Sequence, residues 1–239
     1  MKTLKLTLTA LLTAGVLFSW QFFIAGDRLY WSYRCWTHAK NILSCHGDAF
    51  FDFTADLYGL TYEGNTGNYI DNQILYYGAY EKPVLFLLRD LMTHGYLGNG
   101  VFLDIGANTG QHSLFMSRYA SQIHAFEPYP PVLERFRNLV EKNRIQNIVI
   151  HPIGLGNENS KLPFYKPPDN NLGTGSFVDG FKKDNSYMGL LEIRVGDAEL
   201  ESAGVKDVAV IKMDIEGYEK PALEGLAQYS RQQSTLCRF

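Results

Sequence analysis

Short hydrophobic segments that alternate with helical stretches constrain the fold of this chain most strongly. The first three are residues 101–105, 122–126 and 147–153. A helix is expected after each of the first two, the second of them beginning near Pro131. Strand and helix alternating at this spacing are typical of a parallel sheet with right-handed crossovers. With a fourth buried segment at 208–213, the sequence predicts an α/β, Rossmann-like fold with a mostly parallel sheet.

The other elements have weaker signals. A helix is predicted to begin near Pro83, and residues 155–188, rich in glycine, asparagine, proline and lysine, are predicted to form a loop. Residues 191–195 alternate between apolar and charged, which indicates an exposed or edge strand, and Asp197 is expected to be the N-cap of a short helix. The apolar face of the helix near Pro83 is predicted to consist of Val84, Leu87, Leu88, Leu91 and Met92.

Carboxylates lie at the ends of three predicted strands. They are Asp104, Glu127 and Asp214. In an open parallel sheet, ligands bind beyond the carboxyl ends of the strands, so we expect the three acids to face one crevice. The turn Gly106–Gly110 has glycines where the chain must turn tightly, but it lacks the G-x-G-x-x-G pattern. A pyrophosphate-binding dinucleotide site is therefore disfavoured.

The first two acids indicate which ligand the crevice attracts. Asp104, beside the turn, would repel a pyrophosphate and attract an ammonium or sulfonium group. Glu127 follows Asp104 by 23 residues, which is close to the spacing at which an acid holds ribose hydroxyls in Rossmann-like sites. A ligand with a ribose and a cationic amino-acid tail satisfies both acids. The sequence therefore predicts S-adenosylmethionine as the cofactor.

Three separated motifs resemble, in this order, the FkbM family of S-adenosylmethionine-dependent methyltransferases. They are VFLDIGANTG at 101–110, AFEP at 125–128 and IKMDIEGYE at 211–219. The resemblance covers roughly residues 78–226. It implies a class I methyltransferase fold and O-methylation of a hydroxyl on a sugar, a glycolipid or a natural product.

The resemblance also implies roles for individual residues. The cofactor's amino-acid end is assigned to Asp104, Gly106, Asn108 and Gly110, its ribose to Glu127, and the surroundings of its methyl group to Asp214 and Glu216. Asp214 is the expected general base for the acceptor hydroxyl.

Simpler roles stay open for the same residues. Gly106 and Gly110 could serve the turn alone. If Glu127 does not bind the ribose, it is a solvated strand end. If Asp214 and Glu216 do not lie near the methyl group, they cap the following helix. His112 follows the turn but is assigned no role, because a histidine at such a place more often packs or bonds the backbone.

Charge and cysteine usage exclude other classes of function. The formal net charge is −3 and no basic patch is present, so nucleic acid is not an expected partner. Cys35, Cys45 and Cys237 show no zinc-binding spacing, and no metal site is predicted. Cys35 and Cys45 either form a disulfide in an oxidising compartment or remain separate thiols. The expected partner is a small-molecule or glycan acceptor, whose identity the sequence does not give.

The N-terminal residues 1–26 differ from the rest. Lys2 and Lys5 precede an uncharged run from Leu6 to Gly26, which as a helix is long enough to span a bilayer. This predicts an N-terminal hydrophobic helix and a membrane localisation with a single-pass anchor. A cleaved signal peptide and export form the alternative, and the membrane side of the domain stays open.

Three segments are therefore predicted: the anchor at 1–26, an aromatic-rich cap at 27–80 and a methyltransferase domain at 81–239. The cap is expected to contain short strands and turns, which either cover the core or form a wall of the acceptor pocket.

The C-terminal tail raises a competing hypothesis. Residues 226–239 lack the hydrophobic strand expected next, so the last strands are predicted to be missing and one sheet edge to be exposed. The leading function is an O-methyltransferase. The alternative is a non-catalytic or inactive binding protein built on a truncated methyltransferase domain, and an NAD-dependent oxidoreductase is disfavoured by the turn.

Overall fold

The computed structural model describes residues 50–93, 100–232 and 236–238. The chain divides into two units between residues 49 and 50, and all of the described residues belong to the second unit. The predicted N-terminal helix at 1–26, together with Cys35 and Cys45, lies outside the described residues.

The predicted membrane localisation is corrected by the structure. Within the described ranges, no helix is long and apolar enough to cross a membrane. The longest of these helices, α6 (Pro130–Lys142), has 13 residues, whereas a spanning helix needs about 20. The prediction of a single-pass membrane protein is therefore wrong for the part of the chain that the structure describes.

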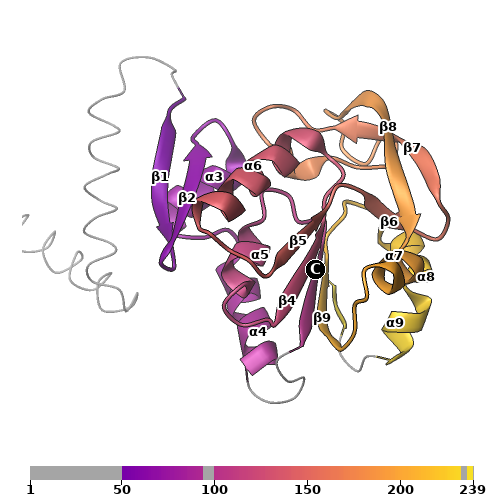
Figure 1. Cartoon of the computed structure of the whole chain (residues 1–239). Coiled ribbons are helices and arrows are strands. Elements are labelled where there is room, and N and C mark those ends of the chain that lie inside the picture. Colours follow the sequence, from indigo (N-terminus) through magenta and orange to yellow (C-terminus); the bar gives the residue numbers. More distant parts are fainter. Residues whose placement is uncertain (1–49, 94–99, 233–235, 239) are drawn as a thin grey trace, which may run out of the picture. The chain divides into compact units, whose positions relative to one another are not determined.

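A five-stranded sheet, parallel throughout, forms the centre of the fold, with the strand order β10-β9-β3-β4-β5 (Figure 1). Its strands are β3 (Val101–Ile105), β4 (Gln122–Phe126), β5 (Ile148–His151), β9 (Val208–Met213) and β10 (Leu236–Arg238). The first four confirm the predicted parallel α/β sheet. β10, which pairs with β9, is a strand that was not expected in the tail.

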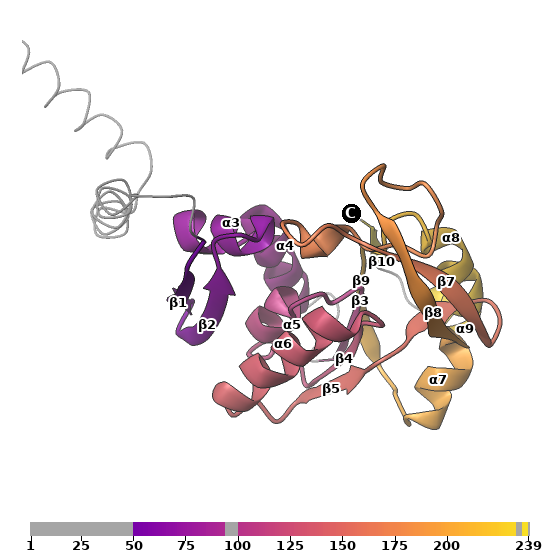
Figure 2. The ribbon, with the colours of Figure 1, turned by 90° about the horizontal axis from the view of Figure 1, so that it is seen from above.

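Helices cover both faces of this sheet, as Figures 1 and 2 show. Alternate residues of β3 enter opposite cores: Phe102 packs in one, and Leu103 and Ile105 pack in the other. The first core is covered by α4 (Lys82–Thr93), α5 (Gln111–Met116) and α6, and the second by α7 (Gly196–Ser202), α8 (Glu219–Gly225) and α9 (Ala227–Gln232). Burial on both faces explains why these strands are hydrophobic without alternation.

The buried face of α4 differs from the predicted one. Its buried residues are Leu85, Leu88 and Met92, whereas Leu87 is 45% exposed. The run Val84–Leu88 is apolar at every position, so periodicity alone did not fix which side faces the core.

Asp197 is not the N-cap of the helix that contains it. The N-cap of α7 is Val195, which makes no side-chain capping bond. The Asp197 carboxylate instead accepts hydrogen bonds from the backbone N–H groups of Gln228 (2.9 Å) and Tyr229 (3.2 Å). It therefore satisfies free donors at the start of α9.

Residues 50–80 form a hairpin and a helix. β1 (Asp52–Leu57) pairs antiparallel with β2 (Leu60–Asn65), and α3 (Tyr69–Tyr77) follows. The strands agree with the prediction, but α3 was not expected. The residues that could have predicted α3 are its N-cap asparagine, Asn68, and its left-handed C-cap glycine, Gly78.

A second, three-stranded sheet has the order β6-β8-β7. Its strands are β6 (Gly154–Gly156), β7 (Ser160–Lys166) and β8 (Ser186–Val195). The predicted loop at 155–188 therefore contains a full strand and a 3₁₀ turn, η1 (Leu172–Thr174). β7 lies at an edge with partly exposed lysines, and such a strand lacks the apolar signal of a buried one.

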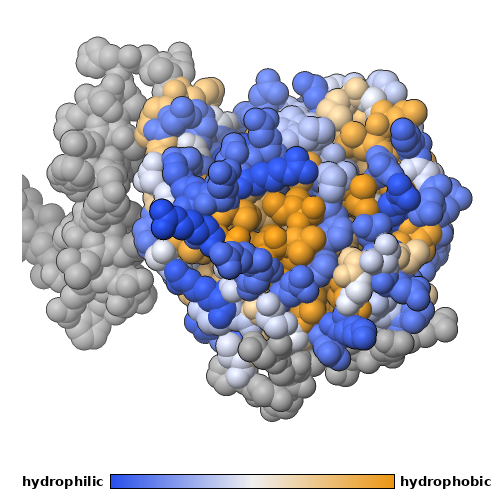
Figure 3. Space-filling model, viewed as in Figure 1, coloured by the Kyte–Doolittle hydropathy of each residue, from blue (hydrophilic) through white to orange (hydrophobic). Residues whose placement is uncertain are grey.

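An apolar area lies at the centre of the face shown in Figure 3, where Figure 1 places β4 and β5. Val149 in β5 is 37% exposed. β5 is the last strand at this side of the described sheet.

Candidate active site

A cavity opens beyond the carboxyl ends of β3, β4 and β9. Because these strands are parallel neighbours, the residues that follow them meet at one edge, as predicted. Two backbone hydrogen bonds join the strand ends: Gly106 N–H donates to Phe126 O (2.9 Å), and Asp214 N–H donates to Ile105 O (3.0 Å). Five predicted site residues line the cavity: Gly106, Asn108, Glu127, Asp214 and Glu216.

The glycine turn requires glycine at both of its ends. Gly106 and Gly110 have φ of +79° and +81°. A Cβ on Gly106 would lie 2.0 Å from the backbone oxygen of Asp214, and one on Gly110 would lie 2.0 Å from the ring of Phe136. Gly106 thus lets the Asp214 backbone approach the turn, while Gly110 lets α6 pack against it. Gly110 does not itself line the cavity.

Glu127 is buried and held by two backbone donors. One carboxylate oxygen accepts from Asn108 N–H and the other from Tyr129 N–H, each at 2.8 Å. Burial raises the Glu127 pKa to about 7, against the lowering effect of these two hydrogen bonds. Glu127 is therefore not a solvated strand end.

Asp104 is fully buried and paired with a lysine. Asp104 and Lys212 are direct register partners on the neighbouring strands β3 and β9. Lys212 Nζ lies 3.2 Å from Asp104 Oδ1 and donates to Gly106 O at 2.9 Å, and Ser113 Oγ donates to Asp104 Oδ2 at 2.7 Å. Burial lowers the Lys212 pKa, but the carboxylates of Asp104 and Asp214 outweigh it, so the net pKa shift is upward and the ammonium stays charged.

This pair changes the role expected of Asp104. Its carboxylate does not line the cavity, and the adjacent ammonium balances its negative charge. The direct attraction that we predicted between Asp104 and a cationic ligand stays a prediction. The position of Asp104 outside the cavity lining and its pairing with Lys212 do not favour it. Lys212, which does line the cavity, was not identified as a site residue. The feature of the sequence that could have identified Lys212 is a single lysine near the end of an otherwise apolar strand.

Asp214 and Glu216 lie at the cavity and do not cap α8. The N-cap of α8 is Tyr218, without a side-chain bond. The N–H groups of Ile215 and Gly217 donate instead to Glu219 Oε1, at 3.1 and 3.2 Å. Burial and the nearby Asp214 carboxylate raise the Glu216 pKa.

His112, which follows the turn and was assigned no role from the sequence, also belongs to this cavity. It lines the cavity, and its Nε2 is buried, 3.8 Å from Glu81 Oε2. Burial and the Lys212 charge lower the His112 pKa to about 4, so the ring is neutral at pH 7. Burial and the Asp214 carboxylate raise the pKa of Glu81.

Further lining residues come from segments that carry no motif. Tyr69, Ile70 and Tyr80 from the cap line the cavity, whereas Tyr62 is fully buried in the core. The cap therefore both covers the core and forms a wall. The predicted loop adds an aromatic group, in which Phe164 contacts Tyr129 and Phe177 with ring centroids 5.5 and 5.1 Å apart.

Known proteins similar to this chain include two methyltransferases. "Methyltransferase 1" of Beauveria bassiana is 28% identical over an alignment of 142 residues, and the match covers 52% of this chain and 57% of that protein. The hexuronic acid methyltransferase AglP of Haloferax volcanii is 31% identical over 130 residues, 53% of this chain and 49% of that protein. The matched part thus spans about half the length of these relatives.

Among solved structures, the chain is similar to methyltransferase FkbM from Methylobacillus flagellatus KT. The TM-score is 0.40 at 20% identity, and the match covers 59% of this chain and 32% of that one.

A family model defines the identity more firmly than these pairwise matches. The methyltransferase FkbM domain matches residues 104–239, more than half of the chain. This range begins at the buried Asp104 and contains the glycine turn, Glu127 and Asp214. It confirms the family that the three motifs predicted, and the chain belongs to the family of FkbM-domain methyltransferases.

Proposed function

We propose that this chain transfers a methyl group from S-adenosylmethionine to a hydroxyl of a sugar, a glycolipid or a natural product. The observation that carries the proposal is the cavity at the carboxyl ends of β3, β4 and β9, where the glycine turn, Glu127 and Asp214 come together. Methylation of hexuronic acid by the Haloferax volcanii relative supports a sugar-like acceptor.

The residues around the cavity fit this cofactor. Glu127 presents a buried carboxylate, each of whose oxygens accepts one backbone N–H and retains acceptor capacity for a ribose hydroxyl. Phe126, Tyr129 and Phe164 add an apolar wall suited to a purine ring. Gly106 and Asn108 place the backbone of the glycine turn at the same cavity, which suits the amino-acid end of the cofactor.

S-adenosylmethionine supplies an activated methyl group, so the protein's main task is alignment. In the proposed site, Glu127 accepts hydrogen bonds from the ribose, and the backbone of the turn holds the amino-acid end. Asp214 accepts the proton of the acceptor hydroxyl as a general base, with Glu216 beside it. Lys212 keeps the turn in place through its bond to Gly106 O.

The experiment combines cofactor binding with methyl transfer. The full chain is titrated with S-adenosylmethionine by calorimetry, with NAD as the control ligand. Transfer of labelled methyl is then measured on a panel of hydroxyl-bearing sugars and glycolipids. In Asp214→Asn we expect cofactor binding to persist while transfer falls about 100- to 10,000-fold, the usual contribution of a general base.

Each outcome decides a different part of the proposal. A folded chain that binds NAD and not S-adenosylmethionine would overturn the cofactor assignment. Binding without transfer to any acceptor in the panel would favour the non-catalytic alternative. An Asp214→Asn variant with undiminished transfer would remove Asp214 from the role of base.

A further inference from the structure

A second cavity opens between the β1–β2 hairpin, α6 and the loop before η1. We call it the hairpin groove, and its lining residues include Phe50, Asp52, Asn68, Arg135, Asp169 and Asn170. Leu172 lines both this groove and the cavity beyond the carboxyl ends of β3, β4 and β9, which we call the cofactor cavity. The two are separated by a backbone hydrogen bond in which Tyr69 N–H donates to Asn170 O (3.1 Å). The proposed methyl transfer does not use the hairpin groove.

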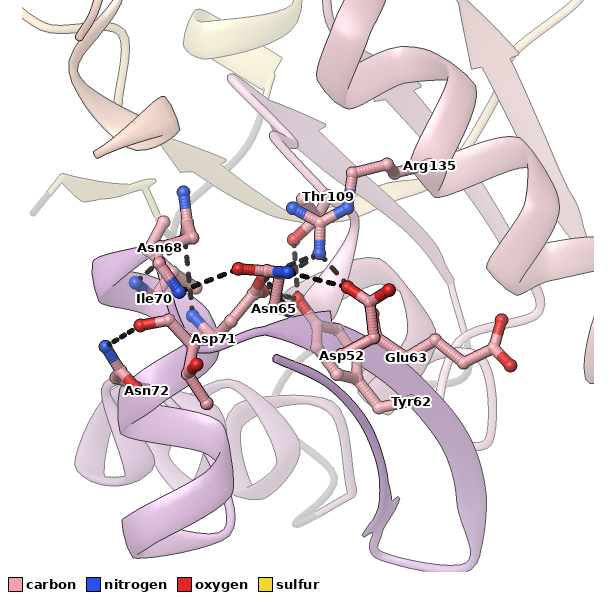
Figure 4. Close-up of polar contacts among 12 residues, drawn as sticks. Asp52, Tyr62, Glu63, Asn65, Asn68, Ile70, Asp71, Asn72, Thr109 and Arg135 are labelled. Atoms are coloured by element: carbon pink, nitrogen blue, oxygen red, sulfur yellow. Dashed lines mark hydrogen bonds and ion pairs between the residues drawn. The ribbon is translucent and has the colours of Figure 1, made fainter. Parts of the chain in front are cut away.

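Asn68 places a fixed hydrogen-bond donor at the groove. Its side chain is 4% exposed, and Oδ1 accepts from Ile70 N–H (3.0 Å) and Asp71 N–H (3.3 Å). Because the oxygen caps α3, the amide nitrogen must lie on the other side, as Figure 4 shows. This Nδ2 is buried and has no hydrogen-bond partner among the described residues. A ligand acceptor atom would satisfy it.

The floor beside Asn68 is held rigid by a buried aspartate, Asp71 (Figure 4). Asp71 accepts from the hydroxyl of Tyr62 (2.8 Å), from Asn65 N–H (2.9 Å) and from Arg135 Nη2 (2.8 and 3.0 Å). The Arg135 guanidinium is therefore committed to Asp71. The part of the groove wall formed by Asn65 and Arg135 is preorganised, because both residues are bonded to Asp71.

The remaining charges in the groove are negative. Asp52 and Asp169 are exposed carboxylates, and the carboxylate of Glu63 is paired with Lys142. Among the described lining residues, Arg135 is the one cation, and it is already neutralised. An anionic ligand would meet carboxylates without a free positive charge, which is unfavourable.

Aromatic surface adjoins these polar groups. Phe50 is 70% exposed and Phe53 is partly buried, and both line the groove. A phenylalanine ring offers an apolar face, while the neighbouring amides and carboxylates offer donors and acceptors. Uncharged sugars have complementary surfaces, since their C–H faces are apolar and their hydroxyls both donate and accept.

We propose that the hairpin groove is a subsite for an uncharged sugar residue of the acceptor. This inference rests on the proposed methylation of a glycan and adds a specificity to it. A hydroxyl or ring oxygen accepts from Asn68 Nδ2, the carboxylates of Asp52 and Asp169 accept from hydroxyls, and Phe50 covers a C–H face. Leu172 lines both cavities, so in this proposal one acceptor passes over Leu172 to reach both of them.

The test measures sugar binding by the full chain on an array. The array carries neutral oligosaccharides and matched oligosaccharides that contain hexuronic acid. Phe50→Ala removes an exposed ring, while Asn68→Asp keeps a capping oxygen and replaces the donor nitrogen by a negatively charged acceptor oxygen. Tyr187→Ala in β8, 61% exposed and outside both cavities, is the matched control.

We expect the neutral oligosaccharides to be bound in preference to the acidic ones. Phe50→Ala and Asn68→Asp should each weaken that binding about tenfold, the equivalent of about one hydrogen bond, and Tyr187→Ala should not. No binding to any neutral sugar, preference for hexuronic acid, or binding unaffected by both groove variants would overturn the subsite.

Calorimetry with S-adenosylmethionine on the same samples separates the two proposals. Unchanged cofactor affinity in the groove variants supports a site distinct from the cofactor cavity. If the wild type does not bind the cofactor, the proposed function fails, while the array still decides whether the hairpin groove binds sugar.

Discussion

Two regions of this molecule each contain a fully buried aspartate with a cationic partner, and they hold it in different ways. Beneath the cofactor cavity, Asp104 is paired with Lys212, which is 3% exposed. Beside the hairpin groove, Asp71 is paired with Arg135, whose side chain is 27% exposed. Removing a buried ion's partner is costly because the remaining charge cannot return to water.

The difference lies in the partners that would remain. Without its lysine, Asp104 keeps one side-chain donor, Ser113. Without its arginine, Asp71 keeps the hydroxyl of Tyr62 and the backbone N–H of Asn65. The cavity region therefore depends on a single cation, whereas the groove region relies on a network.

The largest expected effect is on folding stability in Lys212→Met. This change leaves the Asp104 carboxylate buried and uncompensated, so we expect a loss of about 3–5 kcal/mol in the free energy of unfolding. Arg135→Met is the matched comparison and should cost less, about 1–3 kcal/mol, because Asp71 keeps two donors. Urea unfolding followed by circular dichroism measures both.

Adding Asp104→Asn to Lys212→Met should recover part of the loss, because the uncompensated charge is then removed. Equal losses of unfolding free energy in the two single variants, or a larger loss in Arg135→Met, would contradict the distinction between an isolated ion pair and a hydrogen-bonded network.

The next effect is on cofactor binding through Glu127. Its pKa is about 7, and in the proposed site only the ionised form would accept from both ribose hydroxyls. Affinity for S-adenosylmethionine should therefore rise as the pH increases from about 6 to 8, at most tenfold per pH unit. Glu127→Gln should bind about 10- to 100-fold more weakly, the loss of a charge-assisted hydrogen bond, and without this pH dependence. Calorimetry at several pH values measures both.

Stability gives an independent check on Glu127. Its folded pKa lies above the ordinary value of 4.5, so its contribution to stability is complete below about pH 4.5 and is lost as the pH rises towards 7. Urea unfolding of the ligand-free chain across this range should show the loss in the wild type and a smaller one in Glu127→Gln. Identical pH dependence in the two proteins would contradict the raised pKa.

The smallest effect concerns the link between the two regions. The Tyr62 hydroxyl donates to Asp71 and lies 3.0 Å from Thr109 Oγ1, in the glycine turn. Because Tyr62 has one proton to give, Thr109 donates to Tyr62. A double-mutant cycle of Tyr62→Phe and Thr109→Val should give a coupling energy of about 0.5–1.5 kcal/mol. Additive single effects would show that the groove and the turn are energetically independent.

The two regions also differed in how far the sequence predicted them. The turn, Glu127 and Asp214 were predicted because each lies next to a hydrophobic strand, so local pattern and sheet geometry were sufficient. The hairpin groove was not predicted, because its members come from β1, β2, the N-cap of α3, α6 and the segment around η1. Asn68 was visible only as a possible helix cap, and Arg135 as one of many charged residues on a helix.

What the sequence by itself determined is local: the four strands β3, β4, β5 and β9, the two glycines of the turn and the acids at the strand ends. Those features depend on residues within a few positions of each other, where periodicity and backbone preferences act directly. The tertiary structure decided the pairings over long separations. Asp104 meets Lys212 through the register of β3 against β9, and Asp71 meets Arg135 across 64 residues. No local pattern encodes such contacts, because they exist only once separate elements have packed together.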